Sequence, residues 1–321
     1  MATPNLSEIV TSTLRNRTGK ARDAVSINSG LMVRLKEKGK QRPFSGGRTI
    51  VEEVEYAENG TYLRYSGYDP LNIQPSDILT AAEYNIKQAA VAVTMSGLEQ
   101  LQNSGKEQVI DLLAQRISNA ERTFANNLTR DMYSDGTASG GKQIGGLKAL
   151  VSDAGTGTVG GIDSSAWGFW ANQTVSFSGL SLTPGSTTIQ QAMNTLYLKL
   201  IRNRDMPDII VFDTTYYNYY LSSLQTIQRI QNDKLAQAGF QTLKFMGSDV
   251  VLDGGLGGAI SANHGYFLNT NYLYWRPHRD RNVEVLGGNR EPVNADSMVR
   301  LMAWAGNMTT SNRMLQGVLV N

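Results

Sequence analysis

Residues 106–134 read KEQVIDLLAQRISNAERTFANNLTRDMYS and carry the longest helical pattern in the chain. Apolar residues recur there at spacings of three and four, which places them on one face of an α-helix. That stripe consists of Val109, Leu113, Ile117, Ala120, Phe124 and Leu128. At a rise of about 1.5 Å per residue the helix would be about 40 Å long. Such a length suits an extended strut better than a layer of a compact domain.

A β-hairpin is predicted upstream of this helix. Residues 49–56 (TIVEEVEY) are rich in strand-forming residues. Asn59-Gly60 then favours a tight turn, because both central positions of such a turn need a positive φ, and residues 61–65 are predicted to return. Two strands alone are marginally stable in water, so the hairpin needs a surface from its own chain or a neighbour. Residues 81–95 predict one further strand.

The N-terminal stretch is basic and lacks periodicity. Residues 1–48 contain ten Lys or Arg against three Asp or Glu, a local charge of +7 on a chain whose net charge is +2. Residues 1–45 therefore read as an extended arm. Such a charge favours contact with a polyanion or an acidic partner surface, and a solvated tail is the alternative. The residues expected to touch nucleic acid, or to dock the arm, are Arg15, Arg17, Lys20 and Arg22.

The C-terminal half mixes helices and strands without regular alternation. Helices are predicted from residue 187 or 189 to 202 and over 214–231, with a buried strand at 207–213 between them. Further strands are predicted at 250–252, 265–268, 272–275 and 299–304. This order indicates an α+β fold rather than a doubly wound sheet.

The composition excludes several kinds of chemistry. The 321 residues suffice for one large domain or a few coupled ones, and charged residues are only 18%. The absence of cysteine excludes disulfides and thiolate nucleophiles. His264 and His278 lack metal-ligand spacing and read as surface or packing residues. No membrane span or signal peptide is visible, so we expect a chain made in the cytoplasm. No catalytic constellation is visible either, so we expect no enzyme activity and no cofactor.

Three further clusters have two interpretations each. The glycines after Asp253 could cradle a phosphate, but no helix pattern follows them, which argues against a nucleotide site. The tyrosines at 216, 217, 219 and 220 could stack on bases, although their helical spacing favours packing. A charged cluster could contact nucleic acid, but its mixed signs favour ion pairs between subunits; it comprises Arg276, Arg279, Asp280 and Arg281.

The order of these parts resembles the tailed-bacteriophage major capsid proteins, with their Hong Kong 97-type fold. Local similarities lie in YNIKQAAVAVTMS (84–96), in Gly146-Leu147 with TVGGID (158–163) and Trp170, and in PDIIV (207–211). FMGSDVVLD (245–253) followed by YFLN (266–269) resembles the family's return to its second sheet. The similarity spans nearly the whole chain, and the order of the segments carries it.

The resemblance implies a division of the α+β chain into the family's parts. These are an N-terminal arm (1–45), an E-loop (46–86) with its tip at Asn59 and Gly60, a P-domain with a spine helix (87–185), an A-domain (186–262), P-domain return strands (263–304) and a C-terminal segment completing the A-domain (305–321). It also implies self-assembly into pentamers and hexamers of an icosahedral virion shell around double-stranded DNA. Scaffolding, portal and decoration proteins are further partners of this family, and no membrane is involved.

Two departures from family members are expected. Some relatives crosslink their shells through a lysine of the E-loop, but residues 48–86 contain no lysine, so no crosslink is expected. Because the long helix begins near residue 106, a fused scaffold segment is not expected either. The alternatives are an encapsulin shell of the same fold, an α+β enzyme using His264 or His278, or another virion component such as a tail or decoration protein.

Overall fold

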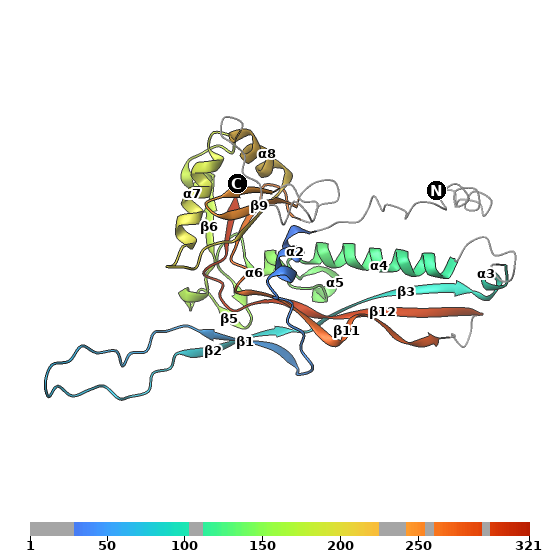
Figure 1. The fold of residues 1–321 in the computed structure, drawn as a ribbon, viewed down its shortest axis with the longest axis horizontal. Coiled ribbons are helices and arrows are strands. Elements are labelled where there is room, and N and C mark those ends of the chain that lie inside the picture. The colour runs from blue at the N-terminus through green and yellow to red at the C-terminus, as the bar shows by residue number, and fades with distance from the viewer. Residues whose placement is uncertain (1–28, 103–111, 225–241, 254–259, 291–295) are drawn as a thin grey trace.

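The computed structural model describes residues 29–102, 112–224, 242–253, 260–290 and 296–321. Figure 1 shows three parts: a compact sheet domain that carries the C-terminus, a long narrow sheet with helix α4 along it, and a loop. The loop projects to the left, and the narrow sheet extends to the right. The molecule is therefore elongated, and much of the chain lies far from any single core.

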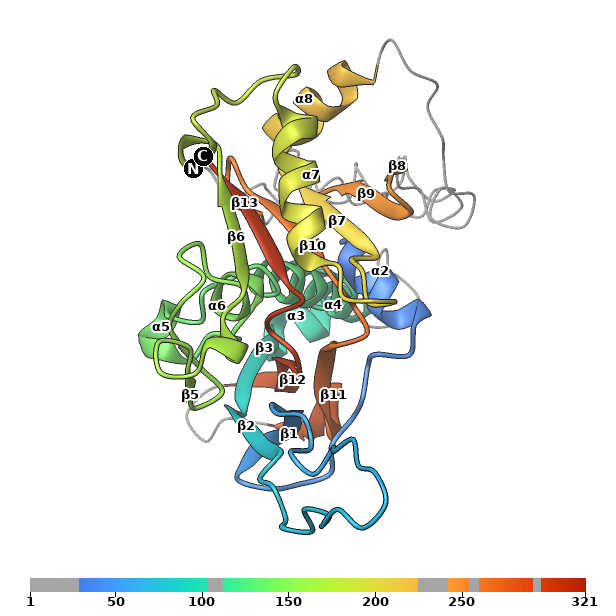
Figure 2. The same cartoon turned by 90° about the vertical axis from the view of Figure 1, so that its left-hand side faces the viewer.

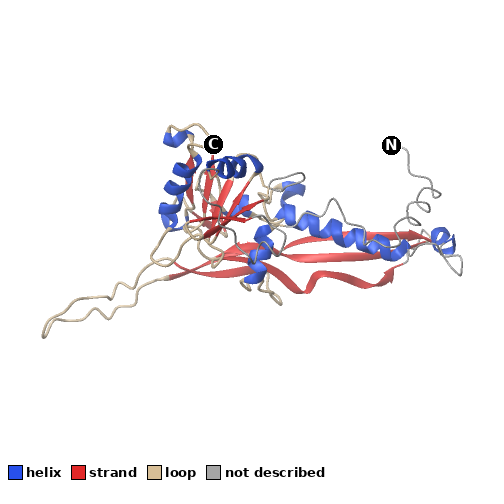
Figure 3. Cartoon of the chain, turned by 45° about the horizontal axis from the view of Figure 1, so that its top comes forward, coloured by secondary structure: helices blue, strands red, loops and turns tan. Residues whose placement is uncertain are grey.

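The long narrow sheet has three antiparallel strands in the order β11-β12-β3, formed by β11 (Leu273–Arg290), β12 (Ser297–Thr310) and β3 (Lys87–Ser96). Helix α3 (Gly97–Gln102) follows β3, and helix α4 (Leu112–Asp131) runs along the sheet (Figures 1 and 3). Phe124 and Leu128 of α4 are buried in the same core as Trp304 of β12. The long helix predicted from sequence is confirmed over α4, while residues 106–111 lie outside the described part.

Helix α4 ends three residues earlier than predicted. The amides of Tyr133 and Ser134 donate to the carbonyls of Arg130 and Asp131, which tightens the last turn. The carbonyl of Met132 then accepts from Leu147. Met132 and Tyr133 are buried in this turn, so the apolar pattern continues past the helix without prolonging it.

Strands β1 (Thr49–Glu55) and β2 (Leu79–Asn85) form a separate antiparallel pair, in which Thr49 faces Asn85 and Glu55 faces Leu79. They lie below β11 and β12, on the side away from α7 and α8 (Figures 1 and 2). The side chains of Ile50, Glu52 and Val54 are buried, and the residues between them are exposed, as expected of a strand with one covered face. The single strand predicted at 81–95 is thus two strands, β2 and β3, which join different sheets on either side of Ile86.

The compact domain is built on a six-stranded sheet in the order β6-β13-β10-β7-β9-β8. The neighbours β6 and β13 are parallel, as are β7 and β9. Of the described elements, helices α7 and α8 also belong to this domain (Figure 2), and their side chains share its core. Its elements are β6 (Gln173–Ser176), α7 (Ile189–Leu200), β7 (Ile209–Phe212), α8 (Thr214–Ser223), β8 (Thr242–Phe245), β9 (Ser248–Leu252), β10 (Gly265–Leu268) and β13 (Gly317–Val320).

Packing is the role of the tyrosines in α8. Tyr216, Tyr217 and Tyr220 are buried among the core residues of the compact domain. Asp213 begins the helix as its N-cap, with its carboxylate accepting from the amides of Thr215 and Tyr216. The packing interpretation is therefore confirmed for these three tyrosines. Residues 225–231, the rest of the predicted helix, lie outside the described part.

Sheet membership differs from the expected division of the chain in three places. Strand β10, expected among the P-domain return strands, pairs with β7 and β13 in the compact domain. Residues 305–310, expected to complete the A-domain, continue β12 of the narrow sheet, and only β13 joins the compact domain. Strand β6, expected in the P-domain, lies beside β13. Apolar strands alone do not reveal which sheet they enter, because both sheets bury them.

Short elements fill the connection between α4 and the compact domain. Two tight strands, joined by the turn Gly160-Gly161, form a miniature hairpin in which both glycines have positive φ. The elements of this connection are α5 (Ala138–Gly141), α6 (Leu147–Leu150), β4 (Thr158–Val159), β5 (Ile162–Asp163), η1 (Gly168–Trp170) and η2 (Ser178–Leu180).

The expected extended arm is partly a helix. Helix α2 (Gly30–Glu37) buries Leu31 and Leu35 completely in the main core. These leucines are four residues apart and therefore share one face. Downstream, residues 41–44 run beside β11, where Phe44 bridges to His278. The prediction of an unpacked arm is thus wrong for residues 30–44, because Leu31 and Leu35 give α2 an apolar face and residues 41–44 pair with β11.

Candidate functional site

The loop 56–78 is the most exposed part of the described chain. It projects from β1 and β2 without regular secondary structure, and none of its residues is buried. Yet it carries large apolar side chains, with Tyr68 fully exposed and Ile73 exposed by 88%. Six of the sixteen exposed large apolar residues fall in this loop: Tyr62, Leu63, Tyr65, Tyr68, Leu71 and Ile73. Apolar surface gathered in this way marks an interaction site.

The turn of this loop lies away from Asn59 and Gly60. The amide of Ser66 donates to the Asp69 carboxylate at 2.9 Å, and the amide of Asp69 donates to the Ser66 carbonyl, so the chain reverses around Gly67. Asn59 lies part-way along, where its side-chain oxygen accepts from Thr61 and, at 3.2 Å, from Ser76 on the returning limb. The predicted tip and return strand are wrong, because β1 pairs only with residues from Leu79 onward.

A groove opens at the root of the loop, with a volume of about 670 Å³. Its wall of three aromatic rings is formed by Tyr56 and Phe169, stacked with 5.4 Å between ring centres, and Trp167 at 6.1 Å from both. The Trp167 side chain is 54% exposed. The carboxylates of Asp77, Glu83 and Asp163 also line the groove.

A buried arginine holds the wall of this groove. Arg313, in the turn between β12 and β13, is completely buried. Its guanidinium donates to the carbonyls of Leu150 (2.6 Å) and Trp170 (3.2 Å) and to Asn172 Oδ1 (2.9 Å). It also contacts Ser152 Oγ at 3.1 Å and, at 3.4 and 3.5 Å, the carbonyls of Gly157 and Thr156. Burial lowers the pKa of Arg313 to about 10. One side chain therefore ties residues 150–172 to the C-terminal strands.

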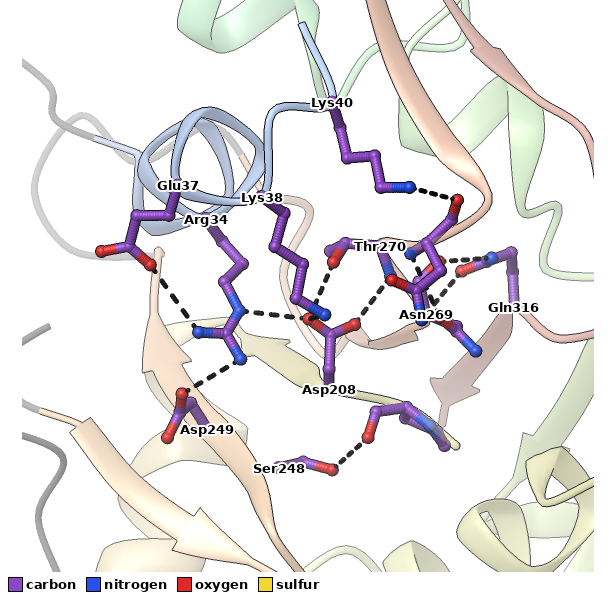
Figure 4. Close-up of polar contacts among 12 residues, drawn as sticks. Arg34, Glu37, Lys38, Lys40, Asp208, Ser248, Asp249, Asn269, Thr270 and Gln316 are labelled. Atoms are coloured by element: carbon purple, nitrogen blue, oxygen red, sulfur yellow. Dashed lines mark hydrogen bonds and ion pairs between the residues drawn. The ribbon is translucent and has the colours of Figure 1, made fainter. Parts of the chain in front are cut away.

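Helix α2 is anchored to the compact domain by charges (Figure 4). Arg34 Nε lies 3.1 Å from Asp208 Oδ2, and Arg34 Nη2 lies 3.5 Å from Asp249 Oδ2. Lys38 Nζ lies 2.9 Å from the same Asp208 oxygen. Asp208 also accepts from the amide and hydroxyl of Thr270, each at 2.7 Å. This network fixes the position of α2 against the compact domain.

A buried carboxyl joins three parts of the chain. Asp253, at the end of β9, accepts hydrogen bonds from Ser29 Oγ at 2.8 Å and from the Tyr133 hydroxyl. Burial raises the pKa of Asp253, and burial followed by the nearby Asp253 charge raises that of Tyr133. The start of α2, the end of α4 and the six-stranded sheet thus meet at one polar centre. Residues 254–259, the glycine stretch considered for phosphate, lie outside the described part.

The charged cluster of residues 276–281 divides into two. Arg276 pairs within the chain, with Nε 3.3 Å from Glu52 Oε1, and Glu52 also accepts from Thr309 Oγ1 at 2.8 Å. Arg276 therefore has an ion-pair partner within its own chain. The other members are exposed on a bulge, where four residues of β11 lie opposite one residue of β12. These exposed members are Arg279, Asp280 and Arg281.

The remaining candidates are placed as follows. Arg15, Arg17, Lys20 and Arg22 lie outside the described residues. His264 Nε2 lies 3.1 Å from Asp153 Oδ2, and the His278 ring packs edge-on against Phe44. Within the described ranges no group of His, Asp or Glu has the arrangement of a metal site. Among the helices that the structure describes, none has both the length and the apolar character needed to cross a bilayer.

Sequence reasoning missed the α2 anchor, Arg313 and the groove. The anchor had a signal, since Arg34 and Lys38 are one helical turn apart beside Leu31 and Leu35. Arg313 had none, because its partners are mostly backbone carbonyls. The groove had none either, because its walls come from three separated segments.

No protein-family model and no curated sequence matches the chain. Solved structures do. The capsid asymmetric unit of cyanophage A-1(L) aligns with a TM-score of 0.64 at 15% identity, over 95% of this chain and 98% of that one. The chain has the Hong Kong 97-type capsid fold. The resemblance stated from sequence is therefore confirmed at the level of the fold.

Two more structures show the same fold. The capsid of the native GTA particle aligns with a TM-score of 0.56 at 13% identity, over 100% of this chain and 95% of that chain. The SrpI encapsulin of Synechococcus elongatus PCC 7942 aligns with a TM-score of 0.54 at 10% identity, over 100% and 96%. Phage capsids and an encapsulin thus share the capsid fold of this chain.

Proposed function

We propose that the chain is the major capsid protein of a tailed bacteriophage, and that it self-assembles into pentamers and hexamers of an icosahedral shell. The observation that carries this proposal is loop 56–78, which exposes six large apolar side chains and buries none of its residues. Ordering such a loop costs conformational entropy that its own contacts do not offset. Burial against neighbouring copies supplies the missing stabilisation.

The shell encloses double-stranded DNA in this proposal. The basic stretch containing Arg15, Arg17, Lys20 and Arg22 contacts phosphates without reading bases, or docks on neighbouring subunits. The protein acts as a structural component of the virion, assembled in the host cytoplasm, and not as an enzyme. Scaffolding, portal and decoration proteins are its further partners, and it needs no membrane and no cofactor.

Loop variants test the proposal by electron microscopy of the purified chain. Wild-type protein should form closed shells, whereas the triple variant Tyr62→Ser, Tyr68→Ser, Ile73→Ser should stay as small oligomers with an unchanged circular dichroism spectrum. The matched control is Leu198→Ser, an exposed apolar residue of α7, which should assemble normally. Tubes, or monomers at high concentration, from the wild-type chain would refute the shell proposal.

An encapsulin shell is the second candidate, because the similarity to the SrpI encapsulin covers the whole chain. A phage capsid encloses DNA, whereas an encapsulin shell encloses a cargo protein. Particles purified from their natural source and treated with nuclease should release protected double-stranded DNA if the chain is a phage capsid. Particles that release a cargo protein and no DNA would identify the encapsulin function instead.

A further inference from the structure

The groove at the root of loop 56–78 has unpaired negative charge. Asp77 and Asp163 are exposed on its rim, and Glu83 lies beside them. Among the described residues none of these three carboxylates forms an ion pair. Most of the rest of the groove lining is apolar or aromatic. Trp167 of the aromatic wall and Leu79 are both more than half exposed. A surface of this kind suits a guanidinium, which stacks on aromatic faces and pairs with carboxylates.

The bulge of β11 has the complementary chemistry. Arg279 and Arg281 are exposed there, and neither forms an ion pair within the described ranges. Asp280 lies between them, and its amide donates to Nδ1 of His278 at 3.1 Å. The amide of Arg279 is fixed by the Phe44 carbonyl at 2.9 Å, so the segment is held firmly at its base.

Backbone strain occurs in a second irregularity of β11, between Asn282 and Glu284, directly after the bulge. Val283 has a φ of +58° and an exposed side chain. A β-branched residue rarely adopts a positive φ, because its Cβ then crowds the backbone. Strain of this kind persists where the surrounding structure enforces it, and it gathers at functional surfaces. The strained residue therefore directly follows the bulge that carries the two arginines.

Groove and bulge do not pair within one chain. Arg276, at the start of the bulge, contacts Glu52 in the middle of β1, and the bulge continues beside Phe44, which precedes β1. The groove extends from Glu83, which lies opposite Val51 of β1, to Tyr56 just beyond the end of that strand. Among the described residues no ion pair joins Arg279 or Arg281 to a carboxylate of the groove, so both sets of charges are available to a second copy.

We infer that the acid-rimmed groove of one copy receives the Arg279–Arg281 bulge of a second copy. The guanidinium groups stack on Trp167 and the Tyr56–Phe169 pair and reach the rim carboxylates. This contact deepens the proposed function, on which it rests, because it names two surfaces that join neighbouring subunits. It also makes assembly sensitive to salt, since rim charges are screened.

Charge exchange tests the contact. One variant reverses the groove (Asp77→Lys, Asp163→Lys), a second reverses the bulge (Arg279→Glu, Arg281→Glu), and a third combines all four changes. Each reversal alone should raise the concentration needed for assembly at least about tenfold, through repulsion across the interface. The combined variant should recover assembly, because every interface then pairs opposite charges again. That recovery also shows that the reversed chains fold.

The control and the overturning results are separate. Arg204→Glu, an exposed charge next to the compact domain, should leave assembly unchanged. Normal assembly of the reversed groove would overturn the inference while leaving the shell proposal intact. A further variant combines the reversed groove with acidic replacements of Arg15, Arg17, Lys20 and Arg22 and keeps the native bulge. If this variant recovers assembly, the partner of the groove is the N-terminal stretch, and the inference about the bulge is overturned. A wild-type chain that never assembles would instead refute the proposed function.

Discussion

Replacing Arg313 should destabilise the chain more than any surface change. The guanidinium is completely buried and donates to the carbonyls of Leu150 and Trp170 and to Asn172 Oδ1 at 3.2 Å or less. Arg313→Met fills similar space but leaves these acceptors without a donor. Each hydrogen bond to a charged group contributes about 1.5–3 kcal/mol. Three such losses give about 4–9 kcal/mol.

Relief of the buried charge offsets part of this loss. No carboxylate contacts Arg313 among the described residues, and burial holds its pKa near 10, so the charge itself is costly to bury. We therefore expect a net cost of about 3–5 kcal/mol, at the upper end for a single substitution. The cost of Arg313→Lys should be smaller than that of Arg313→Met but larger than zero, because an ammonium group keeps three donors and lacks the planar geometry of the guanidinium.

Urea unfolding followed by circular dichroism measures this cost. The assay uses unassembled chain at low concentration, so that subunit contacts do not contribute. Arg204→Met is the matched control, since Arg204 is exposed, and it should unfold near the wild-type midpoint. A loss below about 1 kcal/mol for Arg313→Met would refute the assigned role, because it would mean that the carbonyls find other donors.

Four further outcomes are expected. Burial raises the pKa of Asp253, so this group stabilises the fold most below its unfolded pKa and least above its folded pKa. The unfolding temperature of wild type, relative to Asp253→Asn, should therefore rise as the pH is lowered from neutral. The same dependence of unfolding temperature on pH in both proteins would contradict this. Gly160→Ala should cost about 1–3 kcal/mol more than Gly161→Ala by the same urea assay, because both have positive φ but only a Cβ on Gly160 would meet Ala82, at 2.8 Å; equal costs would remove the clash as the cause. Leu31→Ala should cost about 2–5 kcal/mol in that assay, as a cavity at a fully buried site does, and a negligible change would mean that α2 contributes little to the core. Denaturing electrophoresis of intact particles should give one 35.1 kDa band, because residues 48–86 lack lysine, whereas a ladder of larger species would reveal crosslinks.

Long-period patterns were predictable from the sequence. Helix α4 follows from a stripe sustained over several turns, and the strands at 209–212 and 265–268 from continuous apolar runs. Helix α2 was not predicted because its signals, the pairs Leu31–Leu35 and Arg34–Lys38, span only about two helical turns. The strands against which α4 packs could not be predicted. An apolar stripe indicates that one face of a helix is buried, but it does not identify the strand that covers this face.

Pairing over long distances was not predictable. Asn59-Gly60 is a strong local turn signal, yet the strand opposite β1 starts at Leu79. The choice is made by the core, where Ala82 and Tyr84 are buried together with Ile50 and Val54. A local turn preference of this size is outweighed by burial of four side chains. Arg313 and the groove depend on backbone atoms and distant segments, which no pattern of residues displays.

The four tryptophans of the chain are distributed so that one differs from the rest. Trp275 and Trp304 stack on each other inside the protein, with ring centres 5.0 Å apart, and Trp170 is buried with its indole N–H donated to the Val159 carbonyl. Trp167 alone faces water, at the groove. Intrinsic fluorescence therefore has three constant emitters and one that responds to its surroundings, and a blue shift during particle formation would report when the groove fills, without any added label.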